Sequence, residues 1–250
     1  MNNPAYQFPN EFFDYMDPGS RRSAASIVAL LAPKLNPASV LDVGCGRGVW
    51  PGEWSRAGIT DSVGVDGPYV DRASLTIPPQ SFVAWDLSRP LNLERHFDLV
   101  QSLEVAQCVD AGFADVFVDS LCRHGELIMF SAAVPGQGGE RHVNEQPLDY
   151  WREKFASRGY AAFDWVRPAL TNLPNIEPWY RYNCLLYATN RAAAELPSDI
   201  QATKIPVGVP TAEVAPATWR MRNAILRALP RGVVHQLALV KHKLHNLTGR

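Results

Sequence analysis

Three glycines at alternate positions mark the part of this sequence whose chemistry is most readily interpreted. Gly44, Gly46 and Gly48 directly follow a short apolar run. Glycine is needed where the backbone takes a positive φ or where a ligand must touch the main chain. The apolar run is typical of a strand, and open α/β sheets bind ligands beyond the carboxyl ends of their strands. We therefore predict a ligand site at this turn, to which Asp42 and Cys45 also contribute.

Two further acids follow strand-like runs, and their positions suit a nucleoside. Asp66 ends one such run, 22 residues after Gly44, and its carboxylate can accept hydrogen bonds from two ribose hydroxyls. Asp86 follows another run and can accept a hydrogen bond from an adenine amino group. Its neighbours Trp85 and Leu87 can enclose the adenine ring.

Two classes of cofactor compete for this pattern. A dinucleotide fold needs the spacing G-x-G-x-x-G/A, but Val49 stands where the third small residue would be, and the spacing here is G-x-G-x-G. A pyrophosphate also binds at a helix N-terminus, where the nearby carboxylate of Asp42 would be unfavourable. S-adenosylmethionine has no phosphate and offers an ammonium group and a ribose to carboxylates. The position of Asp66 fits both classes, so a nicotinamide-dependent oxidoreductase remains the alternative.

The elements that must position these residues alternate between strands and helices. Strands are expected at residues 39–43, 62–66, 81–85, 97–103 and 126–131, with two late strands at 160–167 and 182–189. Helices are expected at residues 20–35, 50–57, 112–122 and 148–158. This βαβ spacing favours a parallel sheet with helices on both faces. We divide the chain into an N-terminal lid segment (1–19), the α/β domain (20–190), a proline-rich linker (191–216) and a basic amphipathic helical tail (217–250).

Four segments resemble the successive motifs of class I S-adenosylmethionine-dependent methyltransferases, namely Val40–Gly48, Gly64–Asp66, Ala84–Leu87 and Phe97–Ala106. The resemblance implies a Rossmann-like, seven-stranded, mostly parallel sheet whose last strand is antiparallel. It also implies that Gly44 and Gly46 contact the methionine part of the cofactor, Asp66 the ribose and Asp86 the adenine. We add four nearby positions to the predicted cofactor-binding set, which are Arg22, Gly67, Ser102 and Leu103.

A closer resemblance is to a bacterial subgroup of small-molecule methyltransferases often found near glycan or polysaccharide genes. It rests on the segments Asp17–Ala24, Pro135–Gly139, His142–Gln146 and Trp179–Asn183, and it covers roughly residues 10–190. This chain departs from the subgroup after the fourth strand, where the usual Glu-Val-Ala-Glu-His is replaced by Glu104-Val-Ala-Gln107-Cys108. A histidine commonly found there is missing, which puts a catalytic role for that position in doubt.

The expected reaction is an in-line displacement, in which the enzyme aligns the nucleophile with the methyl carbon and the sulfur. An alcohol nucleophile also needs a general base. His142 is the first candidate, because it lies in the loop after the fifth strand and imidazole titrates near neutral pH. Glu104, which follows the fourth strand, is the second. The predicted function is O-methylation of a small hydroxylated acceptor, sugar-like or another natural product. N- or carboxyl-methylation and a catalytically silent cofactor-binding module are the alternatives.

Five side chains are candidates for binding the acceptor, namely Glu145, Gln146, Tyr150, Trp179 and Arg181. For several candidates a structural role remains the alternative. His142 can be a loop histidine, Glu145 and Gln146 can cap the helix that begins near Pro147, and Trp179 can belong to the aromatic core. Arg22 can hold a carboxylate of the cofactor or of an acidic substrate, or belong to a solvated face. The glycines of Pro135–Gly139 predict a mobile loop that closes over the site, with a plain surface loop as the alternative.

Metal sites and export are both disfavoured by the sequence. The acids are spread out, unlike those of magnesium-dependent catechol methyltransferases, so we expect metal-independent transfer. The four cysteines, Cys45, Cys108, Cys122 and Cys184, include no close pair of the kind that zinc sites use. They suit a reducing compartment, and neither a signal-peptide pattern nor a bilayer-spanning apolar run is present. A cytoplasmic location is therefore expected.

Charge is distributed unevenly along the chain. Residues 214–250 hold seven Lys/Arg and no Asp/Glu, whereas the part before them has 17 basic and 25 acidic residues, a balance of −8. An acidic body does not suit nucleic-acid binding. One predicted helical face of the tail carries Val233, Leu237, Val240, Leu244 and Leu247, with His235, His242 and His245 opposite. We expect this helix to dock on its own domain or to pair with a second subunit, and contact with an anionic membrane is the alternative.

Overall fold

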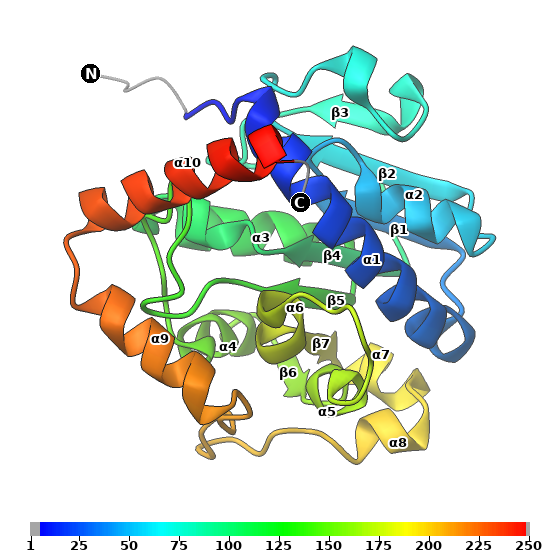
Figure 1. Ribbon diagram of the computed structural model, residues 1–250. Helices are drawn as coiled ribbons and strands as arrows, with labels where there is room; N and C mark the ends of the chain where they lie inside the picture. The colour runs from blue at the N-terminus through cyan, green and yellow to red at the C-terminus, as the bar shows by residue number, and fades with distance from the viewer. Residues whose placement is uncertain (1–5, 249–250) are drawn as a thin grey trace.

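The computed structural model describes residues 6–248, apart from the side chains of residues 231, 242 and 245–248. Its centre is a seven-stranded sheet of order β3-β2-β1-β4-β5-β7-β6 (Figure 1). The strands are β1 (Ser39–Val43), β2 (Asp61–Asp66), β3 (Phe82–Ala84), β4 (Leu99–Leu103), β5 (Leu127–Ser131), β6 (Tyr160–Phe163) and β7 (Leu185–Thr189). Strands β1 to β5 pair in parallel, whereas β7 is antiparallel to both β5 and β6. The predicted seven-stranded, Rossmann-like sheet is confirmed.

Helices cover both faces of the sheet, and two more lie at the C-terminal end of the chain. One face packs against α1 (Asn10–Leu35), α2 (Val49–Arg56), α5 (Val166–Leu170), α6 (Pro178–Asn183), α7 (Asn190–Glu195) and α8 (Ser198–Gln201). The other face packs against α3 (Ala114–His124) and α4 (Leu148–Ala156). The tail forms α9 (Ala217–Arg227) and α10 (Arg231–Thr248).

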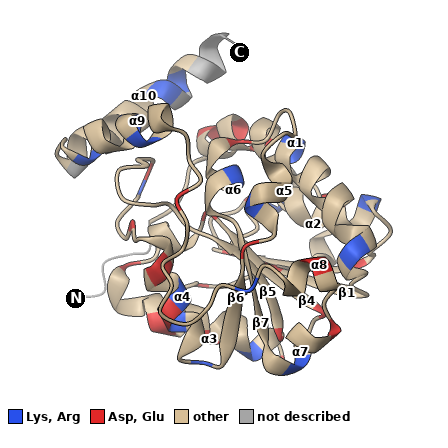
Figure 2. Cartoon of the chain, turned by 90° about the horizontal axis from the view of Figure 1, so that it is seen from below, with Lys and Arg blue, Asp and Glu red and all other residues tan. Residues whose placement is uncertain are grey.

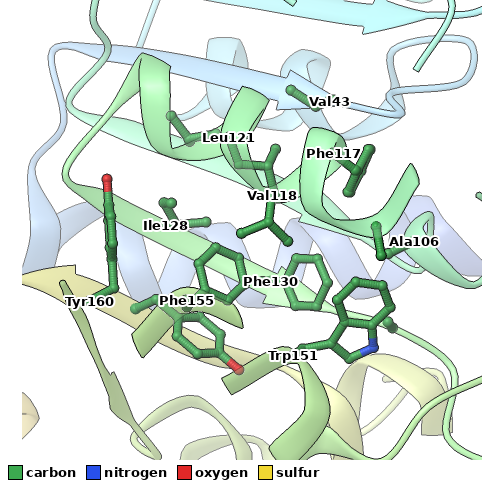
Figure 3. Close-up of a cluster of buried hydrophobic side chains, with 14 of the residues drawn as sticks. Val43, Ala106, Phe117, Val118, Leu121, Ile128, Phe130, Trp151, Phe155 and Tyr160 are labelled. Atoms are coloured by element: carbon green, nitrogen blue, oxygen red, sulfur yellow. The ribbon is translucent and has the colours of Figure 1, made fainter. Parts of the chain in front are cut away.

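Alternate residues of the central strands supply two separate cores, because successive side chains of a strand point to opposite faces. On the α3 and α4 side, Phe130 of β5 packs against Trp151 and Phe155 of α4, with ring centroids 5.3 and 5.2 Å apart (Figure 3). Its neighbour Met129 points the other way and joins the core under α1 and α2. Burial on both faces explains why most strand residues are apolar.

The second core contains a polar pair that bears on the site. Asp42 of β1 and Gln101 of β4 are buried and are partners in the parallel register. Trp54 of α2 donates from Nε1 to Gln101 Oε1 at 2.8 Å. This contact holds the Gln101 amide beside the carboxyl end of β1, where Asp42 precedes the glycines.

The N-terminal boundary differs from the prediction. The helix expected at residues 20–35 begins already at Asn10, so residues 10–19 of the predicted lid segment are the first turns of α1. These turns show no clear apolar period in the sequence. They are held by tertiary contacts instead, since Phe13 is buried and Arg47 of the glycine turn pairs with Asp14 and Asp17.

Short helices replace parts of the two late strands and of the linker. The strand expected at 160–167 ends at Phe163 and is followed by α5, and the strand expected at 182–189 begins only at Leu185, after α6. Proline at the first position of α6 suits a helix start, because its missing N–H would have no partner there. Residues 191–216, expected as a linker, include most of α7 and all of α8.

The predicted helical tail forms as two helices, α9 and α10, and they lie against the body. The ring centroid of Trp219 of α9 is 6.0 Å from that of Tyr182, and Lys241 of α10 lies over the ring of Tyr15 in α1. The outcome for the predicted apolar face of α10 is unexpected, because Val233, Leu237, Val240 and Leu244 are all exposed. The side chains of Leu247, His242 and His245 lie outside the described residues. Among the residues that the structure describes, no helix is both long and apolar enough to cross a membrane.

Candidate active site

The glycine turn connects β1 to α2 and takes backbone conformations that favour glycine. Gly44, Gly46 and Gly48 have φ of 88°, 54° and 84°. The amides of Gly44 and Cys45 donate to the carbonyl of Val65 at 2.7 and 3.1 Å, which ties the turn to the end of β2. A Cβ on Gly44 would collide with the side chain of Val105, so the end of β4 packs directly against this turn. The lack of a side chain at this glycine therefore lets Val105 pack against the main chain where the sequence predicts the ligand.

Asp66 links the turn to β2. Its Oδ2 accepts from the amide of Gly46 at 2.7 Å, and its Oδ1 accepts from the amide of Gly67 at 2.6 Å and from the Tyr69 hydroxyl at 2.5 Å. Burial raises the pKa of Asp66, although these three donors act in the opposite direction. The structure thus brings together Gly46, Asp66 and Gly67, as predicted, and adds Tyr69.

Asp42 is the least satisfied polar side chain near the turn. Within the described part of the chain, its Oδ2 has no hydrogen-bond partner. Burial raises the pKa of Asp42 to about 8, an effect opposed by the Gln101 side chain and strengthened by the charge of Asp66. A buried carboxylate oxygen without a donor is costly, so this atom is well suited to accept from a cationic group of a ligand.

The residues predicted around the adenine lie at the carboxyl end of the neighbouring strand β3. Trp85 and Leu87 are half-buried and pack against the core, and the Trp85 amide donates to the carbonyl of Asp66 at 2.7 Å. Asp86 accepts at Oδ1 from the amide and hydroxyl of Ser88, at 3.0 and 2.7 Å. Asp86 therefore stabilises its own turn through Oδ1.

Glu104 follows β4 and occupies a strained, densely bonded position. Its φ of 60° is unusual for a residue with a side chain, and its amide donates to the carbonyl and hydroxyl oxygens of Ser131 at 2.9 and 3.1 Å. Its carboxylate accepts from Gln137 Nε2 at 2.6 Å and from Asn183 Nδ2 at 3.2 Å. Burial raises the pKa of Glu104 to about 7 in spite of these donors. An acid that titrates near neutral pH can act as a general base.

The last two predicted cofactor residues in this region are buried at the end of β4. Ser102 donates from Oγ to the carbonyl of Val43 at 2.7 Å, which fixes β4 to the last residue of β1. Leu103 packs with the core on the α1 and α2 side. Both stand immediately before Glu104, so the glycine turn and Glu104 are rigidly connected.

His142 and Glu145 form a second polar group, in the loop between β5 and α4. His142 Nδ1 lies 2.8 Å from Glu145 Oε1, and the amides of Gly136 and Gly138 each donate to this carboxylate at 2.7 Å. Burial alone would raise the pKa of Glu145, but His142 and the two amides lower it below its ordinary value. Glu145 thus fixes the glycine-rich segment. It does not cap α4, whose N-terminus has no side-chain cap.

A cavity of about 650 Å³ lies between this loop and the tail helices. His142, Glu145 and Gln146 line it on the loop side, and Arg227 and His235 line it on the tail side. The cavity lining does not include the glycine turn, Asp66 or Glu104. Gly136 and Gly138 line the cavity while the side chain of Gln137, between them, bonds to Glu104. In this conformation the loop therefore lies between the cavity and Glu104.

Four predicted binding residues have other partners. Arg181 donates to the main-chain carbonyls of Leu170, Thr171, Leu173 and Ile176, so its guanidinium stabilises the segment between α5 and α6. Arg22 is exposed and pairs with Glu177 at 3.3 Å. Trp179 packs against the core, as the alternative interpretation expected. Tyr150 packs edge-on against Trp151 and carries Lys154 over its ring.

Sequence reasoning missed four residues that shape the site, namely Tyr69, which bonds to Asp66, and Arg47, Gln137 and Asn183. Arg47 bonds to Asp14 and Asp17, and its guanidinium lies over the ring of Phe13, so it clamps α1 onto the turn. Gln137 and Asn183 hold the carboxylate of Glu104. Arg47 stands inside the glycine motif, and its charge was a usable signal. Gln137 and Asn183 are distant from Glu104 in the sequence, and only the fold brings them to it.

No family model matches the chain. A malonyl-[acyl-carrier protein] O-methyltransferase from Pseudescherichia vulneris is 32% identical over 131 residues, which are 52% of this chain and 52% of that protein. The chain thus matches about half the length of this curated relative.

Solved structures give a similar picture of the fold. A sugar N-methyltransferase from Streptoalloteichus has a TM-score of 0.53 and 18% identity, over 76% of this chain and 96% of its own. The methyltransferase domain of the bacterial protein CtHen1-C has a TM-score of 0.51 and 15% identity, over 68% and 98% respectively. The chain therefore has the fold of the class I S-adenosylmethionine-dependent methyltransferases, and these comparisons support the family that its motifs predict.

Proposed function

We propose that this protein transfers a methyl group from S-adenosylmethionine to an oxygen of a small hydroxylated acceptor. One observation carries the proposal. The glycine turn, with its two buried carboxylates Asp42 and Asp66, packs through Val105 against the end of β4, next to Glu104. A binding site for a cationic nucleoside and an acid with a pKa of about 7 are therefore adjacent.

The residues at the turn fit this cofactor. The Oδ2 atom of Asp42, which has no hydrogen-bond partner, suits an ammonium group. Asp66 suits a ribose diol when the ribose hydroxyl replaces the hydroxyl of Tyr69 as the donor to Oδ1. The main chain of Gly44 and Gly46 would contact the methionine part, and Trp85 and Leu87 would enclose the adenine. When bound, S-adenosylmethionine supplies an electrophilic methyl group on sulfur. The chain's own part is to bind, align and exclude water.

Glu104 is our first choice as general base. In its ionised form it can take the proton of an acceptor hydroxyl, and Gln137 and Asn183 orient its two oxygens for this step. Its left-handed backbone is a strained feature of the kind that clusters at functional sites. The sequence ranked His142 first, but Glu104 is the residue next to the turn.

His142 is the second candidate for the base. Its Nδ1 is engaged with Glu145, which leaves Nε2 to accept a proton, and it lines the cavity. It would serve if the acceptor binds in that cavity. A histidine oriented by a carboxylate is a common catalytic pair.

The acceptor class is inferred from the groups around the cavity. Imidazoles of His142 and His235, the guanidinium of Arg141 and the phenol of Tyr6 offer hydrogen bonds suited to a polyhydroxylated, sugar-like molecule. Movement of the loop 135–146 would join the cavity to Glu104. Methylation of an amine or a carboxylate is the second possibility, because such acceptors need less help from a base.

Calorimetric titration with S-adenosylhomocysteine, with NADH as the control, tests the cofactor. We expect binding near the micromolar level, about −8 kcal/mol, and none with NADH. NADH binding would instead favour a nicotinamide oxidoreductase. A screen of hydroxylated sugars, amines and carboxylates with labelled S-adenosylmethionine then tests the acceptor. Cofactor binding without turnover of any acceptor would favour a catalytically silent binding module.

A further inference from the structure

The tail helices α9 and α10 carry apolar side chains on their outer sides. Their inner sides contact the body through Trp219 and Asn223 of α9 and through Val234 and His235 of α10. The residues on the outer sides are large and apolar, and we call them the tail stripe: Met221, Ile225, Val233, Leu237 and Val240. Polar residues would be expected there if solvent were the only neighbour.

The tail stripe is the main concentration of exposed apolar side chains in the described part of the chain. Its members are 45–63% exposed, and successive members are four, eight, four and three residues apart. Five other large apolar side chains are exposed outside the tail helices, namely Phe113, Val207, Val209, Val214 and Leu229. Soluble monomers rarely expose an extended apolar surface unless it binds something.

The charge around the tail stripe is of one sign. From Val214 to the C-terminus the sequence has seven Lys/Arg and no acid, and Figure 2 shows blue but no red on α9 and α10. Within the described residues, Arg220 and Lys243 form no salt bridge. These cations are thus available to an anionic partner.

The position of the helices leaves this surface accessible. In Figures 1 and 2, α9 and α10 run along the outside of the molecule, and α10 contacts the first turns of α1 through Lys241, which lies over the ring of Tyr15. The cavity lies on their inner side, where it is lined by Leu226 and Arg227 of α9, by Val234 and His235 of α10, and by Leu229 between the two helices. Contact through the tail stripe would therefore not fill the cavity.

We infer that the tail stripe binds an anionic lipid surface. Apolar side chains flanked by Lys and Arg, with no acid among them, match the chemistry of a helix that lies in the plane of a membrane interface. Helix α10 has 18 residues and a length of about 27 Å, which suffices for lying on a membrane. A second copy of the chain is a poorer partner, because two surfaces of the same positive sign would repel each other.

Vesicle flotation with the full-length protein tests this inference. We expect the protein to float with vesicles made of equal parts phosphatidylcholine and phosphatidylglycerol, and to stay in solution with phosphatidylcholine alone. The double variant Ile225→Ser/Leu237→Ser should lower the partition coefficient by about a hundredfold, since each buried apolar group contributes on the order of tenfold. The variant Arg220→Gln/Lys243→Gln should lower it by roughly tenfold or more.

A matched control separates binding through the tail stripe from nonspecific adsorption of exposed apolar residues to the vesicles. Val207 is fully exposed but lies outside the tail helices, so Val207→Ser should float like the unaltered protein. Binding of S-adenosylhomocysteine, measured on every variant, checks that the fold is intact. Equal flotation of the tail-stripe variant and the unaltered protein would overturn the inference. A dimer in solution that Ile225→Ser/Leu237→Ser converts to a monomer, without any binding to vesicles, would also overturn it and assign the tail stripe to self-association.

Discussion

Asn183 donates from Nδ2 to Glu104 Oε1 at 3.2 Å, although the two residues are 79 positions apart in the chain. The same amide nitrogen lies 2.8 Å from Gln137 Oε1, and Gln137 in turn donates to Glu104 Oε2. The end of β4, the loop after β5 and the end of α6 therefore meet at one carboxylate. This arrangement makes Glu104 the best-supported candidate for the base, and it gives two separate tests.

Glu104→Gln removes the carboxylate while keeping its size. If Glu104 is the base, kcat should fall by about 10²–10⁴-fold with an alcohol acceptor. In the unaltered protein the base is ionised only above its pKa of about 7, so activity should rise with pH through that region. Kinetics across pH would measure both effects. Binding of S-adenosylhomocysteine should be unchanged, and activity that keeps its rise near pH 7 in the variant would transfer the role to another group such as His142.

Asn183→Ala tests how the carboxylate is held. The hydrogen bond from Asn183 lowers the pKa of Glu104, so its loss should raise that pKa further above 7. The rising limb of the pH–rate profile should move upward by about one unit. If Asn183 only positioned the carboxylate of Glu104, the variant would lower kcat without moving the rising limb of the pH–rate profile. A profile that stays in place would therefore contradict the proposed effect on the protonation of Glu104.

The sequence predicts the sheet and the position of the glycine turn, and it does so for local reasons. Gly44 and Gly46 are informative because their backbone conformations favour glycine, and Asp66 is informative because it ends a strand next to them. Each signal lies within a few residues of the element that positions it. The alternation of strands and helices then fixes the parallel sheet.

The surroundings of Glu104 and Arg181 and the exposure of α10 could not be derived from such local signals. Glu104 is recognisable as a polar residue after β4, but its raised pKa depends on burial by segments far away in the sequence. The role of Arg181 depends on carbonyl groups of the α5–α6 segment, which carries no strong pattern of its own. The periodicity predicts that the apolar side chains of α10 share one face of the helix. It does not tell whether that face is covered by the rest of the protein.

Arg181→Lys distinguishes a structural role from substrate binding. A lysine cannot reach several carbonyls with the planar fork of a guanidinium, so we expect a loss of roughly 1–3 kcal/mol in the free energy of unfolding. The KM for the acceptor should be unchanged. Arg191→Lys, whose guanidinium pairs with Glu126 on the surface, is the matched control and should change stability little. A raised KM with unchanged stability would restore Arg181 to the acceptor site.

Glu145→Gln tests whether Glu145 fixes the loop. Its carboxylate holds the amides of Gly136 and Gly138 and the ring of His142, and an amide has one acceptor oxygen where the carboxylate has two. Amide hydrogen exchange in the peptide 134–147 should become faster by about tenfold. Glu195→Gln, on the exposed helix α7, is the control. Unaltered exchange together with a loss of activity would point to a direct role in the reaction.

Asp42→Asn tests the cofactor site itself. The free oxygen of Asp42 is proposed to accept from the ammonium group, so the variant should bind S-adenosylhomocysteine about 10–100-fold more weakly. In the unaltered protein the carboxyl group has a pKa of about 8 and must ionise on binding. Affinity should therefore increase with pH up to about 8, by at most about tenfold per unit, and protons should be released. Calorimetry in buffers of different ionisation enthalpy measures that release. Asp61→Asn, at the amino end of β2, should keep the full affinity. Proton release that persists in Asp42→Asn would assign it to Asp66, whose pKa is also raised.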